Sequence, residues 1–173
     1  QPQARHGARL PFDFLLHSLA EAYGARAVCV ILSGTGGDGA LGLKASAFGF
    51  NANALGDKTT AVGDSSLASL DSDSAFGTNA KATGQQSTAL GVGTKASGED
   101  SLAAGSYSSA SGLSSTAVGV ISNASAESST AIGSQSVASK EAATSIGAFA
   151  KADGLAAFAG GTLSTVSKNH GVA

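Results

Sequence analysis

The chain has 173 residues, of which Ala, Gly and Ser together supply 86, while only 5% are aromatic and none is Trp or Met. Such small side chains cannot fill the core of an ordinary globular domain. With 13% charged residues and a formal net charge of −2, the composition excludes a polyelectrolyte-like disordered chain and a basic protein that binds nucleic acid.

The first 45 residues differ from the rest and predict a short α/β segment. They contain every Arg and Pro of the chain and its one cysteine, Cys29. Apolar spacing over 13–23 predicts an amphipathic helix, and the apolar run over 27–32 predicts a buried parallel strand. A Gly-rich turn over 33–39 and a short helical start over 40–45 follow. We therefore place a domain boundary after residue 45, with domains of 1–45 and 46–173.

The Gly-rich turn permits two interpretations. Gly34, Gly36 and Gly39 match the G-x-G-x-x-G pattern of dinucleotide-binding loops, but no room remains for a complete βαβ unit. The segments 5–11, 18–24 and 30–39 together resemble the late part of the chemotaxis-receptor methylesterase domain of the CheB type. This resemblance covers the incomplete α/β fragment only.

The methylesterase resemblance implies that Asp38 is the acid of a Ser-His-Asp triad. The nucleophilic serine of that family should come earlier in the sequence and is missing, and the nearby His6 and His17 both fit a polar surface. A triad acid without its serine and histidine performs no acyl transfer. Asp38 is thus an orphaned acid, and we expect no catalytic residue, no enzymatic activity and no cofactor.

From residue 46 onward the glycines recur every 14 residues. Ala stands two residues before each of them, except at Ser145, and a second small residue stands five after. A unit of 14 is too short for a helix pair and lacks the heptad spacing of a coiled coil. It accommodates two short alternating strands and two turns, as in 116–119 and 122–124. The turn glycines are Gly49, Gly63, Gly77, Gly91, Gly105, Gly119, Gly133, Gly147 and Gly161.

A row of bulky apolar residues directly precedes these glycines. Since a coil this small encloses only Ala-sized groups, we expect the row to face an oligomer axis, with the roll interior as the alternative. An exposed apolar stripe indicates association, and a thin roll buries too little apolar area to fold alone. This ladder consists of Phe48, Val62, Phe76, Leu90, Val118, Ile132 and Ile146.

Units such as 77–84 and 129–133 resemble the head repeats of YadA-like trimeric autotransporter adhesins, and the resemblance covers 46–173. It implies an all-β, left-handed parallel β-roll of about nine coils, assembled as a homotrimer. It also implies a non-enzymatic adhesin head at the outer membrane of a Gram-negative cell surface, which attaches to host matrix or cells as a virulence factor.

Three features depart from that family. Polar residues such as Ser74 and Thr116 stand three before the glycine, the last coil is irregular at 160–161, and no neck, stalk or membrane anchor is present. We therefore expect a fragment of a longer protein that makes no membrane contact itself, and we regard a fusion or mis-assembled gene as the origin of the N-terminal part.

Ligand contacts are expected on outward polar positions of the roll. Other solenoid binding modules and a methylesterase remnant remain the alternatives; a partial Thr ladder (Thr88, Thr116, Thr130 and Thr144) keeps an ice-binding solenoid among them. No metal is expected, because the Asp71/Asp73 pair lacks the nonapeptide of a Ca²⁺-binding roll. Asn123 begins a glycosylation sequon by pattern only. The outward positions are Lys81, Lys95, Asn123, Lys151, Asp153 and the stretch 71–73.

Overall fold

The computed structural model describes residues 39–173. The helix predicted over 13–23, the strand over 27–32, Cys29, the two histidines near the N-terminus and the triad-like Asp38 lie outside the described residues. All regular secondary structure in 39–173 is β. Within that range, no helix has the length and apolar character needed to cross a membrane.

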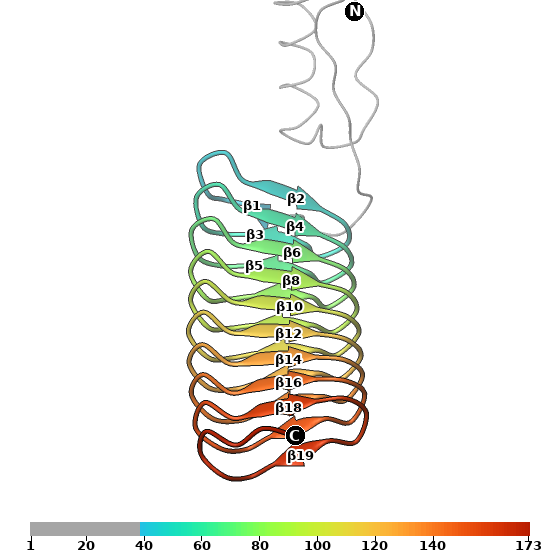
Figure 1. Ribbon diagram of the computed structural model, residues 1–173. Coiled ribbons are helices and arrows are strands. Elements are labelled where there is room, and N and C mark those ends of the chain that lie inside the picture. The colour runs from blue at the N-terminus through green and yellow to red at the C-terminus, as the bar shows by residue number, and fades with distance from the viewer. Residues whose placement is uncertain (1–38) are drawn as a thin grey trace, which may run out of the picture. The chain divides into compact units, whose positions relative to one another are not determined.

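Two parallel sheets form the roll, and every strand pairs with the strand 14 residues away, as in Ala117↔Ala131. This confirms the predicted left-handed parallel β-roll of about nine coils (Figure 1). Sheet A consists of β1 (Gly39–Ala40), β3 (Asn53–Ala54), β5 (Leu67–Ala68), β7 (Lys81–Ala82), β9 (Lys95–Ala96), β11 (Ser109–Ala110), β13 (Asn123–Ala124), β15 (Val137–Ala138), β17 (Lys151–Ala152) and β19 (Thr165–Val166). Sheet B consists of β2 (Ser46–Phe48), β4 (Thr60–Val62), β6 (Ser74–Phe76), β8 (Thr88–Leu90), β10 (Leu102–Ala104), β12 (Thr116–Val118), β14 (Thr130–Ile132), β16 (Thr144–Ile146) and β18 (Phe158–Gly160).

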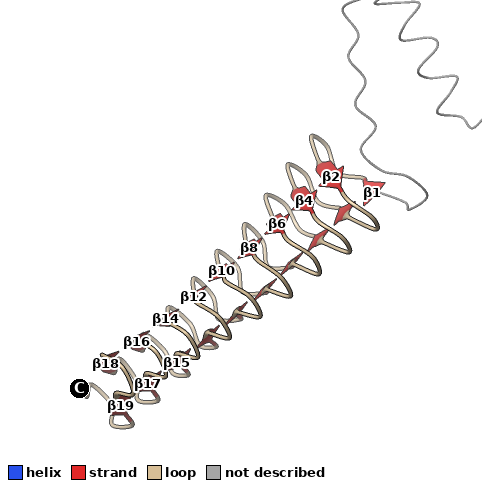
Figure 2. Cartoon of the chain, turned by 90° about the vertical axis from the view of Figure 1, so that its right-hand side faces the viewer, coloured by secondary structure: helices blue, strands red, loops and turns tan. Residues whose placement is uncertain are grey.

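Each coil runs from a strand of sheet B through a turn to a strand of sheet A, and through a second turn to the next coil (Figure 2). We name the edge formed by the first turns T1 and the edge formed by the second turns T2. T1 comprises residues 49–51 and those that follow at intervals of 14, up to 161–163. T2 comprises residues 42–44 and those that follow at the same interval, up to 168–170. The two edges flank both sheets.

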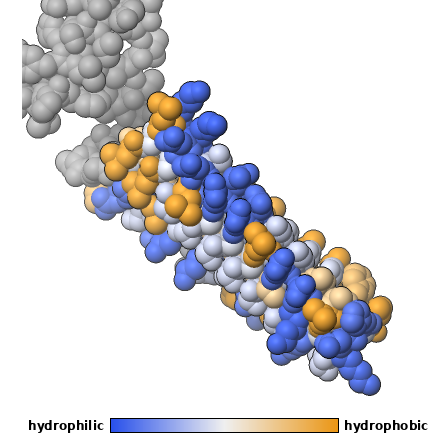
Figure 3. Space-filling view, turned by 90° about the vertical axis from the view of Figure 1, so that its left-hand side faces the viewer, coloured by the Kyte–Doolittle hydropathy of each residue, from blue (hydrophilic) through white to orange (hydrophobic). Residues whose placement is uncertain are grey.

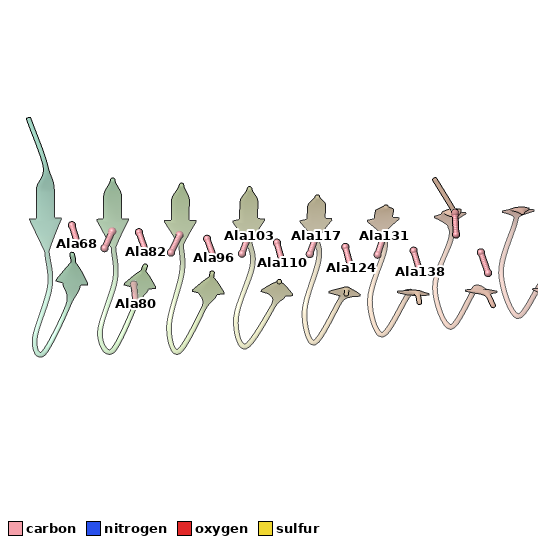
Figure 4. Close-up of a cluster of buried hydrophobic side chains, with 14 of the residues drawn as sticks. Ala68, Ala80, Ala82, Ala96, Ala103, Ala110, Ala117, Ala124, Ala131 and Ala138 are labelled. Carbon is pink, nitrogen blue, oxygen red and sulfur yellow. The ribbon is translucent and has the colours of Figure 1, made fainter. Parts of the chain in front are cut away.

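The interior holds only small side chains, stacked in rows along the roll. From β3 and β4 onward, the central residue of each sheet B strand and the second residue of each sheet A strand are buried, nearly all of them Ala, and they face one another between the sheets (Figure 4). Small residues at the turn ends fill the rest, and their hydroxyls bond to turn carbonyls. Ser66 Oγ, for example, donates to the Gly63 carbonyl at 2.9 Å. The core is thus thin and filled mainly by Ala and Ser.

The turn glycine that ends each sheet B strand has no substitute among L-residues. Gly119 has a φ of +131°, and a Cβ added there would lie 2.5 Å from the carbonyl oxygen of Gly133 in the next coil. Both the backbone conformation and the close stacking of coils therefore require glycine at this position. The sequence-based assignment of the 14-residue glycines to tight turns is confirmed.

Each coil also contains two residues with left-handed φ, seven positions apart, and most are not glycine. Ala142, at φ 55°, is exposed at T2 and has no polar side chain to favour this conformation. The left-handed region costs an ordinary L-residue about 1–2 kcal/mol, and Asn tolerates it better.

Replacement of Ala142 by Asn should therefore raise the free energy of unfolding by about 0.5–1 kcal/mol. Chemical denaturation at fixed protein concentration measures this gain. Ala148, which has no left-handed φ, provides the control, since Ala148→Asn should give no gain. Equal effects at both positions would contradict the explanation by backbone strain.

The helical start predicted over 40–45 is wrong. Gly39 and Ala40 form strand β1, which pairs with β3 in the register Ala40↔Ala54, and residues 42–44 form the first turn of T2. Ala40 and Gly42 stand 14 residues before Ala54 and Gly56, so the repeat already extends into this segment. Residues 39–45 thus belong to the first coil, although composition places them before residue 46. The boundary between the two domains stays a prediction.

Candidate functional site

The bulky ladder lies on the outside of sheet B, not in the roll interior. Because strand residues alternate between faces, the buried Ala at the centre of each strand turns the residue after it outward. Leu90 is 51% exposed and Ile132 is 38% exposed. Val62 and Val118 are half-buried between their ladder neighbours. The single roll therefore presents an apolar stripe from Phe48 to Ile146.

The outer face of sheet B carries no charged residue. Its second outward row consists mainly of Thr and Ser, with Leu102 and Phe158 at the remaining places. The ladder weakens at Ala104 and ends at Gly160, where the neighbouring coils have larger side chains. A face of this composition loses little hydration free energy on contact with another protein surface.

The outer face of sheet A is different, because it carries lysines. Lys81 and Lys95 are both exposed and stand side by side on the adjacent parallel strands β7 and β9. Like charges in this arrangement repel. Further along, Lys151 Nζ lies 2.7 Å from Asp153 Oδ2. The exposure of Lys81, Lys95, Asn123 and Lys151 agrees with the outward positions expected from the sequence.

Asp153 also accepts a hydrogen bond from the Ser139 hydroxyl, at 2.7 Å, which links two adjacent coils. Partial burial disfavours the charged carboxylate, but the hydrogen bonds from Lys151 and Ser139 and the charges of Lys151 and Lys140 outweigh it. Together they hold the pKa of Asp153 below its usual range. The carboxylate therefore acts as a fixed negative charge on the sheet A side.

The T2 edge is charged and mainly acidic. Some of these acids have structural partners: Asp57 Oδ1 accepts from the Leu43 amide at 2.8 Å, and Asp71 Oδ1 accepts from the Asp57 amide at 3.0 Å. Viewed from this edge, the surface is hydrophilic but interrupted by separate hydrophobic spots (Figure 3). The charged residues of T2 are Lys44, Asp57, Lys58, Asp71, Glu99, Asp100, Glu127, Lys140, Glu141 and Lys168.

Asp73 is not an outward residue, and the expectation that the whole stretch 71–73 is exposed is wrong. Asp73 is fully buried in the roll. Its carboxylate accepts from the amide of Leu70 at 2.8 Å and from both the amide and the hydroxyl of Ser87 at 2.9 Å. Asp73 stands 14 residues before Ser87 and 14 after Thr59, both interior residues. The repeat phase was the signal that could have placed it inside.

The T1 edge carries exposed apolar side chains that the sequence analysis did not single out. Among the described residues, Asp64 is the one charged residue of this edge. The residues concerned lie in the turns, outside the strands, so strand alternation gave no reason to select them. The largest are Phe50, Val92, Tyr107, Val120, Ile121, Phe149 and Leu163.

No group of His, Cys, Asp and Glu in residues 39–173 has an arrangement that could hold a metal ion. A half with Asp64 as its one charged residue, formed by the sheet B face and T1, lies opposite a charged half, formed by the sheet A face and T2.

Two family models match this chain. The YadA head domain repeat, in two copies, matches residues 54–80, 71–94, 82–108 and 110–136. The CheB methylesterase model matches residues 1–61. The resemblance of the repeats to YadA heads, and that of the N-terminal part to the methylesterase, are both confirmed by these matches. Among curated proteins, no sequence matches this chain.

A solved structure has the same fold. The collagen-binding domain of the Yersinia adhesin YadA superimposes with a TM-score of 0.52 at 22% sequence identity, over 74% of this chain and 67% of that one. At this identity the likeness concerns the fold, a parallel β-roll. The described coils of this chain thus have the architecture of an adhesin head.

Proposed function

We propose that this chain, which carries YadA head repeats on a parallel β-roll, is the head of a non-enzymatic trimeric adhesin. In this proposal three copies pack their sheet B faces around a threefold axis. The rod they form stands on the outer membrane of a Gram-negative cell and attaches it to host matrix or host cells.

The apolar ladder on an uncharged face is the observation that carries the proposal. A row of exposed or half-buried large apolar side chains from Phe48 to Ile146, weakened only at Ala104, indicates a face that is covered in the assembled protein. The interior of a single roll is filled mainly by Ala- and Ser-sized side chains, so it buries little apolar area per residue. Contact between three ladders adds the apolar burial that the single roll lacks.

The opposite arrangement, with sheet A at the axis, is disfavoured by charge. It would bring Lys81 and Lys95 of three copies together at the axis with no acidic partner on that part of the face. Buried charges without partners are strongly destabilising. The outer face of sheet A therefore remains outside and is the surface available to a ligand.

Multivalent display explains why such a rod can bind with weak individual contacts. Three identical outer faces act together, so their combined affinity exceeds that of one face by orders of magnitude. The homologous Yersinia domain is described as collagen-binding, which makes a fibrous matrix protein the first ligand to test.

Binding of the full chain to immobilised collagen should depend on trimer formation. The unmodified chain is expected to bind, and a monomeric variant is expected to bind about 10²-fold more weakly because avidity is lost. Surface plasmon resonance on collagen, with fibronectin and laminin as parallel surfaces, measures this. Equal binding of trimer and monomer would contradict the proposed use of avidity, and no binding to any of the three proteins would contradict attachment to these matrix components.

The methylesterase match supports a weaker second candidate, a remnant of that enzyme. Residues 39–61, which fall within the match, form coils of the roll and not an α/β fold. The triad still lacks its nucleophile in the sequence. An esterase assay on the full chain should give no turnover, and measurable turnover would favour this candidate.

A further inference from the structure

We propose that the three corners of the trimer are seams in which T1 of one copy packs against T2 of the next. In these seams the apolar residues of T1 meet leucines of T2 at the same height along the rod. This inference rests on the proposed trimer and goes beyond it, because it assigns a second contact surface that fixes how the three chains align.

The position of the edges makes these seams a consequence of threefold packing. T1 and T2 flank sheet B in every coil (Figures 1 and 2). When three sheet B faces surround an axis parallel to the roll, T1 of one copy therefore adjoins T2 of its neighbour. Rotation about this axis does not change height, so equivalent residues of the three copies stay level.

The repeat fixes which turns share a height. One coil advances by about 4.8 Å along the rod, the spacing of neighbouring strands. The centre of a T2 turn follows the end of the preceding T1 turn by six residues and precedes the end of the next T1 turn by eight. Each T2 turn of one copy therefore lies between two successive T1 turns of its neighbour.

Leu113 and Leu155 are the two leucines of T2 whose neighbours in T1 are both apolar. Leu113 falls between the levels of Tyr107 and Ile121. Leu155 falls between the levels of Phe149 and Leu163. All six side chains are more than a third exposed in the single roll. Two separate apolar contacts in each seam follow from this arrangement.

The level between these contacts is polar on both edges. Gln135 of T1 falls between Glu127 and Glu141 of T2, and all three side chains are exposed. A shift of one chain by one coil in one direction would bring Ile121 between the acidic turns of Glu127 and Glu141, and a shift in the other direction would bring Leu113 beside Gln135. The alternation of apolar and polar levels thus favours one alignment of the three chains.

The four apolar T1 residues also have strained backbones. Tyr107, Ile121, Phe149 and Leu163 have φ values between 58° and 62°. This region is uncommon for bulky residues and is a genuine outlier for a β-branched one such as Ile121. The same backbone conformation occurs at this turn position in every coil, as at Ser65 and Gln135, so what distinguishes these four residues is their large exposed apolar side chains, which gain burial in a contact.

Leu70 supplies a control leucine on the same edge, at the first position of its turn, whereas Leu113 stands at the centre of its turn. It is 48% exposed, against 42% for Leu113, and it also lies in a T2 turn. Its neighbouring levels in T1 carry Ser65 and Asn79. The proposed seam therefore gives Leu70 no apolar partner.

The test compares Leu113→Lys with Leu70→Lys in the full chain by sedimentation equilibrium. Leu113→Lys should raise the concentration at which half the trimer dissociates by about tenfold or more, and Leu70→Lys should leave it nearly unchanged. Circular dichroism checks that both variants keep the β-roll. Equal effects of the two substitutions would overturn the seam.

A crosslinking experiment tests the height assignment directly. In a Cys29→Ser background, Tyr107→Cys combined with Leu113→Cys should give a covalent trimer with a short bismaleimide. Tyr107→Cys with Leu155→Cys, three coils apart, should not. A trimer that crosslinks through neither pair, or through the second, would overturn the seam alone. A monomeric unmodified chain would overturn the proposed trimer together with the seam.

Discussion

Replacing Ile132 with Asp should convert the trimer into a folded monomer. Ile132 lies on the ladder of sheet B, and its side chain would be buried at the threefold axis. Three carboxylates brought together there, without partners, cost about 3 kcal/mol or more for each protomer. Sedimentation velocity at micromolar concentration should show a single species with the mass of one chain.

Val137→Asp is the matched control for this substitution. Val137 lies on the outer face of sheet A, and Lys151 is its neighbour on the adjacent strand β17. In the proposed trimer this face makes no contact with another copy. The same chemical change there should leave the trimer intact. Dissociation by both variants would indicate that an acid on any strand weakens the roll, and dissociation by Val137→Asp alone would place sheet A at the axis.

Replacing Ala117 with Leu should unfold the central coils. Ala117 is fully buried and stacks between Ala103 and Ala131 in the interior row. Overpacking of a filled core typically costs 1–3 kcal/mol, and about 3 kcal/mol or more is expected here because the coils above and below prevent expansion. Thermal unfolding followed by circular dichroism should show a large fall in Tm.

Ala104→Leu provides the comparison, because Ala104 lies on the outer face of sheet B, whereas Ala117 lies on its inner face. Ala104 is half-buried between Leu90 and Val118 in the ladder, so a larger side chain fills a gap in the proposed interface. Its Tm should rise or stay constant. A fall as large as that of Ala117→Leu would contradict the assignment of the two faces of sheet B.

The sequence predicted the roll because the repeat is nearly perfect in the residues that determine the coil. The 14-residue glycines and the Ala two before them give the turn and the buried strand centre, as at Gly119 and Ala117. Neither position tolerates a large side chain, so the 14-residue pattern of Gly and Ala is recognisable from the sequence alone. The outward position of the ladder followed from the same alternation of side chains.

The seven-residue half-repeat within each coil was not apparent from glycine spacing alone. In the structure, a buried small polar residue precedes a buried Ala by two positions in both halves of the coil, as at Ser115–Ala117 and Ser122–Ala124. The positive φ values recur with the same interval of seven. Asp73 was placed wrongly because its charge suggested the surface, whereas its phase is that of an interior hydroxyl.

The contacts between copies could not be predicted from one chain's strands. The T1 and T2 residues of the seam are separated by the width of the roll within one chain, so no local pattern relates Tyr107 to Leu113. Their proximity in the proposed trimer depends on their heights along the rod and on the threefold symmetry. Both require the three-dimensional arrangement of the coils.

The mass of the unmodified chain in solution tests the central claim most directly. Sedimentation equilibrium across a range of concentrations should give three times the 16.6 kDa of one chain, with the β signal of the roll retained. A folded species that stays at the mass of one chain at every concentration would contradict the claim that sheet B is an interface between copies.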